Sequence, residues 1–278
     1  MRRRVDDGGR SLPRFLQWNK HRASRLPLLV KYCFIIAILG ALSPLAADTI
    51  HFASGPSRVA LVELYSSEGC SSCPPAEAWM SRLLDAPALW TQVVPVQFHV
   101  NYWDNLGWKD RLATKDFTAR EYAYAADWVS DGVYTPCFVR NGIEWKPEWG
   151  TIGGPAAMTG MLTVDVADDG SCTVAFRPGP GAASSPDGCY EAHLALLGCG
   201  ISSKVTSGEN NGARLVHEFV ALGVAESLLS RNGAGPELRA ELSLPLPVAG
   251  DARRRAVAVW ITPHRELAPV QAAGSWLP

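Results

Sequence analysis

The sequence predicts an α/β fold, a sheet with flanking helices, that continues into a β-rich C-terminal region. In the first half of the chain, apolar strand-like runs alternate with stretches of helical spacing. Beyond about residue 155, short alternating segments separated by Gly, Pro and Asp turns replace that pattern. With 278 residues and 47% hydrophobic residues, the chain can bury a sizeable core and is not disordered or collagen-like. We therefore divide it into an α/β domain over residues 48–155 and a β-rich region over residues 156–278.

The elements of the α/β domain follow one another as strand, helix, strand, helix and strand. The predicted strands cover residues 58–65, 92–100 and 133–142, and the predicted helices cover residues 76–85 and 114–128. Pro95 lacks an N–H group, which indicates an edge, a bulge or a strand start. Thr114 is a candidate helix cap. Asn141-Gly142 is typical of a hairpin turn.

The β-rich region contains six predicted strands and three of the cysteines. The strands cover residues 162–166, 172–176, 189–197, 215–222, 238–244 and 256–261. Cys189 and Cys199 are ten residues apart along what we predict to be one strand, so they should not pair. If the strand of Cys172 runs antiparallel to residues 189–197, Cys172 lies opposite Cys199. We therefore predict a structural Cys172–Cys199 disulfide.

The strongest chemical signal is the Cys70-Ser-Ser-Cys73 motif, which follows the first buried strand and begins a helix. At a helix N-terminus, unpaired N–H groups and the helix dipole favour a thiolate and lower its pKa. A second thiol within disulfide distance then resolves a mixed disulfide. We assign Cys70 as the nucleophile and Cys73 as the resolving thiol. Pro74 and Pro75 fit only the first helical turn.

Two further positions fit dithiol chemistry. Thr135-Pro136 begins a strand in the same half of the chain, where a cis proline suits a tight position. Such a bond beside the dithiol leaves the backbone of Thr135 free to pair with an extended polypeptide. Glu63 lies in the apolar strand before the motif, where a buried carboxyl would have a raised pKa and would shuttle the proton of Cys73. The alternative is an ordinary carboxylate that faces water.

The loop from Asn101 to Asp110 is rich in aromatic side chains. We identify Tyr102 and Trp103 as candidates for holding a client polypeptide beside the dithiol. The alternative is a lid that packs over the sheet, with its acidic residues capping a turn. The sequence does not distinguish between the two.

Several of these motifs together resemble a known family. The resemblance covers about residues 55–275 and rests on residues 63–77, 98–104, 106–110, 134–136 and 208–212. In these segments the chain is similar to the exported, thioredoxin-like family called domain of unknown function 1223. The resemblance implies a thioredoxin-like fold and a disulfide oxidoreductase role, without an established substrate. Cys137 departs from the family, which usually has a polar residue after the proline, and we expect this thiol to pack as a small hydrophobe.

Two other functions remain open from the sequence. Cys-x-x-Cys is also a metal-ligand spacing, and His99 on the next strand would complete a copper or zinc carrier. Alternatively, Cys70–Cys73 is a permanent structural disulfide in a binding protein. We assign no metal ligands and no organic cofactor, because no phosphate-binding Gly loop or paired-carboxylate site is evident.

The N-terminal residues 1–47 differ in charge from the rest. They contain nine Lys or Arg and only two Asp or Glu, so the overall net charge of -1 leaves about eight net negative charges on the remainder. An apolar run at residues 32–42, too short to span a bilayer, precedes small residues, which is typical of a secretory signal peptide. We expect export to the periplasm or outside the cell, or an uncleaved membrane anchor, and no nucleic-acid partner. The expected partner is a client polypeptide or a redox protein joined through a mixed disulfide.

Overall fold

The computed structural model describes residues 49–147, 157–231 and 235–278. The predicted signal segment over residues 1–47 and the predicted boundary at residue 155 lie outside these ranges. Residues 47–278 form one compact unit. Among the described residues, no helix combines the length and the apolar character that a bilayer crossing needs.

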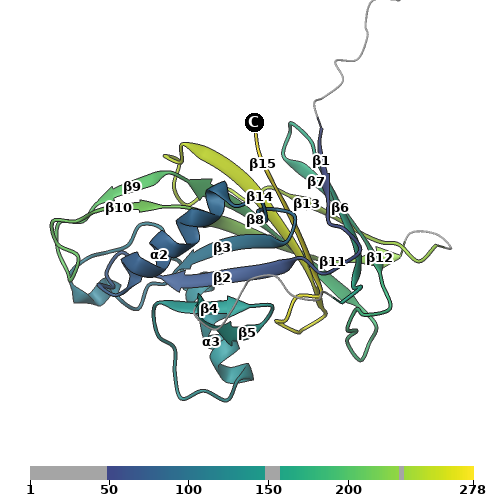
Figure 1. Ribbon diagram of the computed structural model, residues 1–278, viewed down its shortest axis with the longest axis horizontal. Helices are drawn as coiled ribbons and strands as arrows, with labels where there is room; N and C mark the ends of the chain where they lie inside the picture. Colours follow the sequence, from purple (N-terminus) through teal and green to yellow (C-terminus); the bar gives the residue numbers. More distant parts are fainter. Residues whose placement is uncertain (1–48, 148–156, 232–234) are drawn as a thin grey trace, which may run out of the picture. The chain divides into compact units, whose positions relative to one another are not determined.

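The described part of the protein is mostly β, and the predicted α/β fold with a thioredoxin-like sheet and flanking helices is wrong. Figure 1 shows large sheets accompanied by two α-helices, α2 (Cys73–Ser81) and α3 (Lys115–Asp127). Two short 3-10 helices, η1 (Arg82–Asp85) and η2 (Asp104–Leu106), lie in connections. The periodic pattern identified individual helices and strands, but it did not show that strands from the C-terminal half extend the first sheet.

The larger sheet has eight strands in the order β15-β14-β8-β11-β3-β2-β4-β5. In chain order these are β2 (Ala60–Ser66), β3 (Val93–His99), β4 (Cys137–Arg140), β5 (Ile143–Trp145), β8 (Tyr190–Cys199), β11 (Val220–Leu228), β14 (Arg254–Pro263) and β15 (Gln271–Trp276). The sheet thus joins strands from both predicted regions. Its β2-α2-β3 segment is parallel, and β4 and β5 add antiparallel with the predicted Asn141-Gly142 turn at positive φ.

Pro95 lies inside β3 without breaking a ladder. Successive backbone nitrogens of a strand face opposite sides, so the nitrogen of Pro95 faces the same side as that of Gln97, away from β2. On that side, Gln97 donates to the carbonyl of Phe219, and Val220 of β11 pairs with Gln97 alone. β3 lies between β11 and β2 and is not an edge strand, but the missing N–H of Pro95 falls before the point where β11 joins and therefore interrupts no ladder.

The smaller sheets consist of strands from the C-terminal half, apart from β1 near the start of the described chain. The five-stranded sheet has the order β1-β6-β7-β13-β12, and the two-stranded sheet pairs β9 with β10. Their bounds are β1 (Ile50–Ala53), β6 (Gly160–Val166), β7 (Ser171–Pro178), β9 (Ile201–Lys204), β10 (Arg214–His217), β12 (Ser230–Arg231) and β13 (Leu238–Ser243). Phe219 has a positive φ of 57° and divides the predicted strand 215–222 into β10 and β11. The strands predicted from alternation are therefore present, one of them in two pieces.

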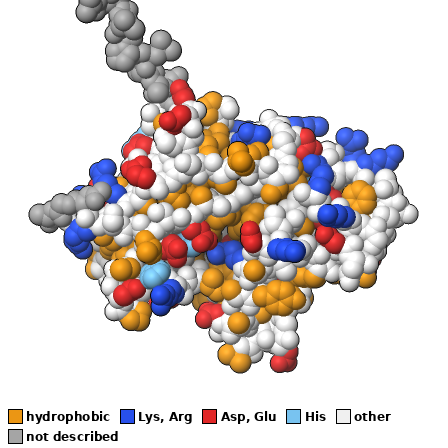
Figure 2. All heavy atoms as spheres, turned by 180° about the vertical axis from the view of Figure 1, so that it is seen from behind, with side chains coloured by type: hydrophobic (Ala, Val, Ile, Leu, Met, Phe, Trp, Pro, Cys, Tyr) orange, Lys and Arg blue, Asp and Glu red, His pale blue; other side chains and the backbone are white. Residues whose placement is uncertain are grey.

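The five-stranded sheet packs its apolar face on the eight-stranded sheet. Leu162, Val164 and Phe176 share one buried cluster with Leu194 of β8 and Val259 of β14. The face in Figure 2 shows charged side chains of both signs interspersed among apolar ones. A central core fills the other side of the larger sheet, around β2, β3 and α3.

The predicted Cys172–Cys199 disulfide is wrong. Cys172 lies in β7 opposite Leu242, whereas Cys199 ends β8 opposite Arg254. The two strands belong to different sheets, and both thiols are free and buried. The prediction failed because it assumed that neighbouring strands in the sequence pair with each other.

Candidate dithiol site

Cys70 and Cys73 form a disulfide, with their Cα atoms 5.5 Å apart. Cys73 is the first residue of α2, and Pro74 and Pro75 occupy the first turn as predicted. Cys70 lies in the turn just before the helix, where its carbonyl accepts a hydrogen bond from the N–H of Cys73. Both cysteines have 0% exposure, so the disulfide is covered by other parts of the chain.

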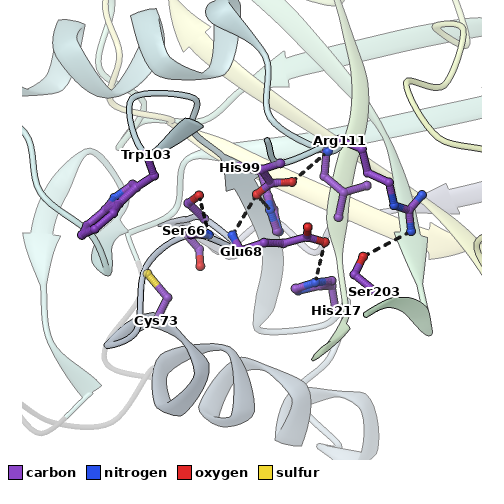
Figure 3. A network of polar contacts seen from close by, with 12 residues as sticks. Ser66, Glu68, Cys73, His99, Trp103, Arg111, Ser203 and His217 are labelled. Atoms are coloured by element: carbon purple, nitrogen blue, oxygen red, sulfur yellow. Dashed lines mark hydrogen bonds and ion pairs between the residues drawn. The ribbon is translucent and has the colours of Figure 1, made fainter. Parts of the chain in front are cut away.

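Trp103 is part of this cover, and it joins three predicted site segments. A Cβ atom on Gly69 would lie 3.0 Å from Cβ of Trp103, so the aromatic loop packs directly on the dithiol turn. The indole Nε1 of Trp103 donates to Oγ1 of Thr135 at 2.8 Å. The Thr135–Pro136 bond is cis, as expected. The structure therefore packs Trp103 on the turn that carries Cys70 and links it to Thr135, the residue before the cis proline, and Figure 3 shows Trp103 on the side of Cys73.

Tyr102 lies one residue before Trp103 and faces α3. Burial and the neighbouring Glu121 raise the pKa of its hydroxyl. Burial likewise raises the pKa of Glu121, to about 8. Tyr102 is thus half-buried against the helix, which favours packing over the open lip that the sequence analysis considered.

The turn between β9 and β10 also covers the dithiol. Asn210 donates to the carbonyls of Glu68 and Cys70, at 2.9 Å each. Glu209 accepts from the backbone N–H and the hydroxyl of Ser71. Sequence reasoning gave these residues no role, although residues 208–212 were among the segments that carried the family resemblance. The polar, Gly-flanked motif at residues 208–212 was the one feature of the sequence that could have indicated a role for this turn.

A buried polar network lies near the disulfide and joins the end of β2 and the turn after it to the middle of α2 and the end of β10 (Figure 3). Nδ1 of His217 is 2.7 Å from Oε2 of Glu77, and its Nε2 is 3.2 Å from Oε1 of Glu68. Ser66 donates to the other oxygen of Glu77, and Trp108 to the other oxygen of Glu68. His217 thus contacts both glutamates, and Ser66 and Trp108 each bind one of them. These residues come from elements that meet at the dithiol turn.

The electrostatics of this network favour a protonated His217. Burial alone would lower the pKa of His217, but the two glutamates raise it to about 10. Burial would raise the pKa of Glu68 and of Glu77, yet contact with His217 leaves both lowered. An imidazolium between two carboxylates therefore stabilises this part of the fold.

His99, the ligand of the metal-carrier alternative, ends β3 beside this network. Its Nδ1 is 2.6 Å from Oδ2 of Asp110, and its Nε2 is 3.0 Å from the amide nitrogen of Gln97. Burial would raise the pKa of Asp110, but His99 lowers it to about 2. Asp110 also accepts the N–H groups of Glu68 and Leu112. The side-chain hydrogen bonds of His99 are thus with Asp110 and Gln97, and its ring packs on that of His217, whereas the two cysteines bond to each other.

Glu63 is buried, as the proton-shuttle interpretation required, but the structure does not bring it to the dithiol. Arg120 of α3 donates to Oε1 of Glu63 at 2.7 Å, and Tyr124 donates to Oε2 at 2.6 Å. Its neighbour Tyr65 packs on the same helix, whereas Val62 and Leu64 face α2. Because side chains alternate along β2, Glu63 points to the face opposite the helix that carries Cys73.

Four further cysteines among the described residues are free, and three of them are buried. Cys137 follows the cis proline and packs in the central core, as expected. Burial raises the pKa of Cys137 to about 12. Cys189 is the exposed one.

Comparison with known proteins identifies relatives by sequence and by fold. The sequence profile of a family described as protein of unknown function (DUF1223) matches residues 61–262. No curated protein matches the chain. A crystal structure of a protein from Agrobacterium tumefaciens is similar at a TM-score of 0.55 and 23% identity, over 79% of this chain and 94% of the other. HBP35 of Porphyromonas gingivalis is similar at a TM-score of 0.53 and 15% identity, over 80% of this chain and 76% of the other.

Proposed function

This chain belongs to the DUF1223 family, and we propose that it is a thiol–disulfide oxidoreductase that works through Cys70 and Cys73. The observation that carries the proposal is the disulfide itself, which closes a turn at the start of α2; Trp103 connects this turn to Thr135, the residue before the cis proline Pro136. A disulfide over so short a loop removes little entropy from the unfolded chain, so stabilisation alone does not explain it well. A relation to the thioredoxin superfamily, which the motifs suggest, belongs to this proposal and rests on the motifs alone.

The proposed exchange proceeds in two balanced steps. A client thiolate attacks Sγ of Cys70, the Cys70–Cys73 bond breaks, and its electron pair passes to Sγ of Cys73 as a thiolate, which takes up a proton. A second client thiolate then attacks the mixed disulfide and releases the Cys70 thiolate. The client dithiol is oxidised to a disulfide and the protein disulfide is reduced to a dithiol. The same steps run in reverse with a disulfide client, and the reduction potentials set the direction.

Exchange requires that the cover over the disulfide opens. Trp103 and the 207–212 turn both contact the dithiol turn, and both cysteines are fully buried. Moving the indole breaks one hydrogen bond to Thr135, and moving the turn breaks the bonds from Asn210 and to Glu209. A client polypeptide would replace these contacts, with the backbone at Thr135 as its docking point. The segment 1–47 supports the further proposal that the reaction takes place after export, in an oxidising compartment.

The same burial favours a second candidate, a binding protein in which the disulfide is structural. The two candidates differ in whether the folded protein can be reduced. We would equilibrate the full chain in glutathione buffers and follow the dithiol by alkylation and mass spectrometry, together with near-ultraviolet circular dichroism. The proposal expects reversible two-electron reduction with the fold retained. Reduction that occurs only on unfolding would establish the structural role instead.

A trapping experiment tests the roles of the two thiols. A Cys73→Ser variant, expressed in the exporting cell, should accumulate a mixed disulfide through Cys70, because the resolving thiol is missing. A variant that also carries Cys189→Ser should trap equally well, since Cys189 is exposed but lies outside the site. Adducts that persist in a Cys70→Ser, Cys73→Ser variant would contradict the assignment.

A further inference from the structure

We propose that Glu77, His99 and His217 form a binding site for a divalent transition-metal ion of the zinc type, separate from the disulfide. The three residues come from α2, β3 and β10, three elements that are distant in sequence. Each offers one ligand atom, and these atoms all lie within 4.8 Å of one another. All three side chains are buried, and the two imidazole rings are 4.9 Å apart, edge to face.

His99 is already oriented as a metal-binding histidine is. Metal-bound histidines commonly pair their second ring nitrogen with a carboxylate, which fixes the ring and its tautomer. Nδ1 of His99 makes such a contact with Asp110, and two backbone N–H groups hold that carboxylate in place. Nε2 then carries the lone pair of the ring, which here accepts a hydrogen bond from the side-chain amide of Gln97, and a bound ion would take the place of that donor.

Two orphaned polar atoms provide an independent indication of a missing ligand. Nε2 of His217 and Oε1 of Glu68 are fully buried and, apart from the ion pair that they form with each other, neither has a hydrogen-bond partner among the described residues. They lie 3.2 Å apart, but their orientation is not that of a hydrogen bond. Buried polar atoms are nearly always satisfied, so two such atoms beside the cluster call for a partner that both can approach.

The charge and chemistry of the cluster select the class of ion. Three buried carboxylates, on Glu68, Glu77 and Asp110, have only histidines as their described ion-pair partners. A divalent cation would offset this excess of negative charge. Two imidazole nitrogens and a carboxylate oxygen are a ligand set that suits zinc, and the ion would replace the proton that His217 otherwise carries between its two glutamates. Ligand atoms around tetrahedral zinc lie about 3.4 Å apart, so ligand atoms that are now up to 4.8 Å apart would approach one another by up to about 1.4 Å.

The test measures Zn²⁺ binding to the full chain with its disulfide intact, after treatment with a chelator. Isothermal titration should show one tight site, and a Cys70→Ser, Cys73→Ser variant should retain it, which excludes binding by the two thiols. Glu77→Gln keeps the size of the side chain and removes its charge, so the affinity should fall at least tenfold. Asp110→Asn, which weakens the orientation of His99, should lower it by about 10- to 100-fold.

His193→Ala is the matched control, because His193 is also buried and paired with a glutamate but lies outside the cluster. This variant should bind Zn²⁺ as the parent does. X-ray absorption of the unmutated zinc-loaded protein gives a readout that does not depend on any variant folding. The expected first shell contains imidazole nitrogen and carboxylate oxygen. Absence of a tight site, a shell containing sulfur, or an affinity unchanged in Glu77→Gln would each overturn the proposal and leave the oxidoreductase proposal untouched.

Discussion

Replacing Glu63 by Gln should destabilise the protein strongly without altering its dithiol chemistry. Glu63 is fully buried, and its charge is balanced by Arg120, whose side chain is only 13% exposed. The guanidinium also lies over the rings of Phe98, Tyr124 and Trp260, so it cannot turn into water without leaving the core. The substitution therefore leaves an uncompensated cation in place.

The geometry sets the size of the effect. Opposite unit charges 2.7 Å apart attract by about 6 kcal/mol at an effective dielectric constant of about 20. Desolvation offsets much of this attraction, and removing one partner of a buried pair typically costs about 3–5 kcal/mol. We expect Glu63→Gln to lower the free energy of unfolding by that amount. Glu63→Leu combined with Arg120→Met should cost less than the sum of the two single changes.

Urea unfolding followed by circular dichroism measures this free energy. Glu226→Gln is the control, because Glu226 also pairs with a basic side chain, that of His193, but is 53% exposed. This substitution should lower the free energy of unfolding by less than about 1 kcal/mol. A loss below about 1 kcal/mol for Glu63→Gln would refute the reasoning. So would a shift in the pH dependence of disulfide reduction, which would restore Glu63 as the proton shuttle that the sequence suggested.

Three further outcomes follow from the same contacts. Trp103→Ala should speed the reduction of the native disulfide by dithiothreitol several-fold, and Trp103→Phe should speed it less. Equal reduction rates in the parent and both variants would show that the indole does not shield the disulfide. In the oxidised protein, iodoacetamide at pH 8 should modify Cys189 first, because burial raises the pKa of Cys137 and of Cys199 to about 12 and keeps them as thiols; peptide mapping that finds Cys137 modified first would contradict this. Thr114→Ala should cost about 1 kcal/mol, since Thr114 accepts the N–H of Phe117 as the cap of α3, and Thr114→Ser should restore most of it.

Local sequence patterns correctly predicted the features that depend only on interactions between neighbouring residues. Thr114 caps α3, Asn141-Gly142 makes the hairpin turn, and Cys73 begins α2 with its prolines in the first turn. Each of these depends on the φ and ψ preferences or hydrogen bonds of a few consecutive residues. The cis bond before Pro136 belongs to the same class. Such features need no knowledge of what packs against them.

Local patterns could not predict which segments distant in the sequence come into contact. Asn210 meets Cys70 across 140 residues, His217 meets Glu77 across the same separation, and Cys172 and Cys199 lie in different sheets. These contacts depend on which strand edges join and in which register, and many registers satisfy the same alternation of apolar residues. The face on which Glu63 lies is a result of that pairing too. The local sequence thus defined the dithiol and the elements that carry it, whereas the tertiary structure decided the fold class, the cover over the dithiol and the buried network behind it.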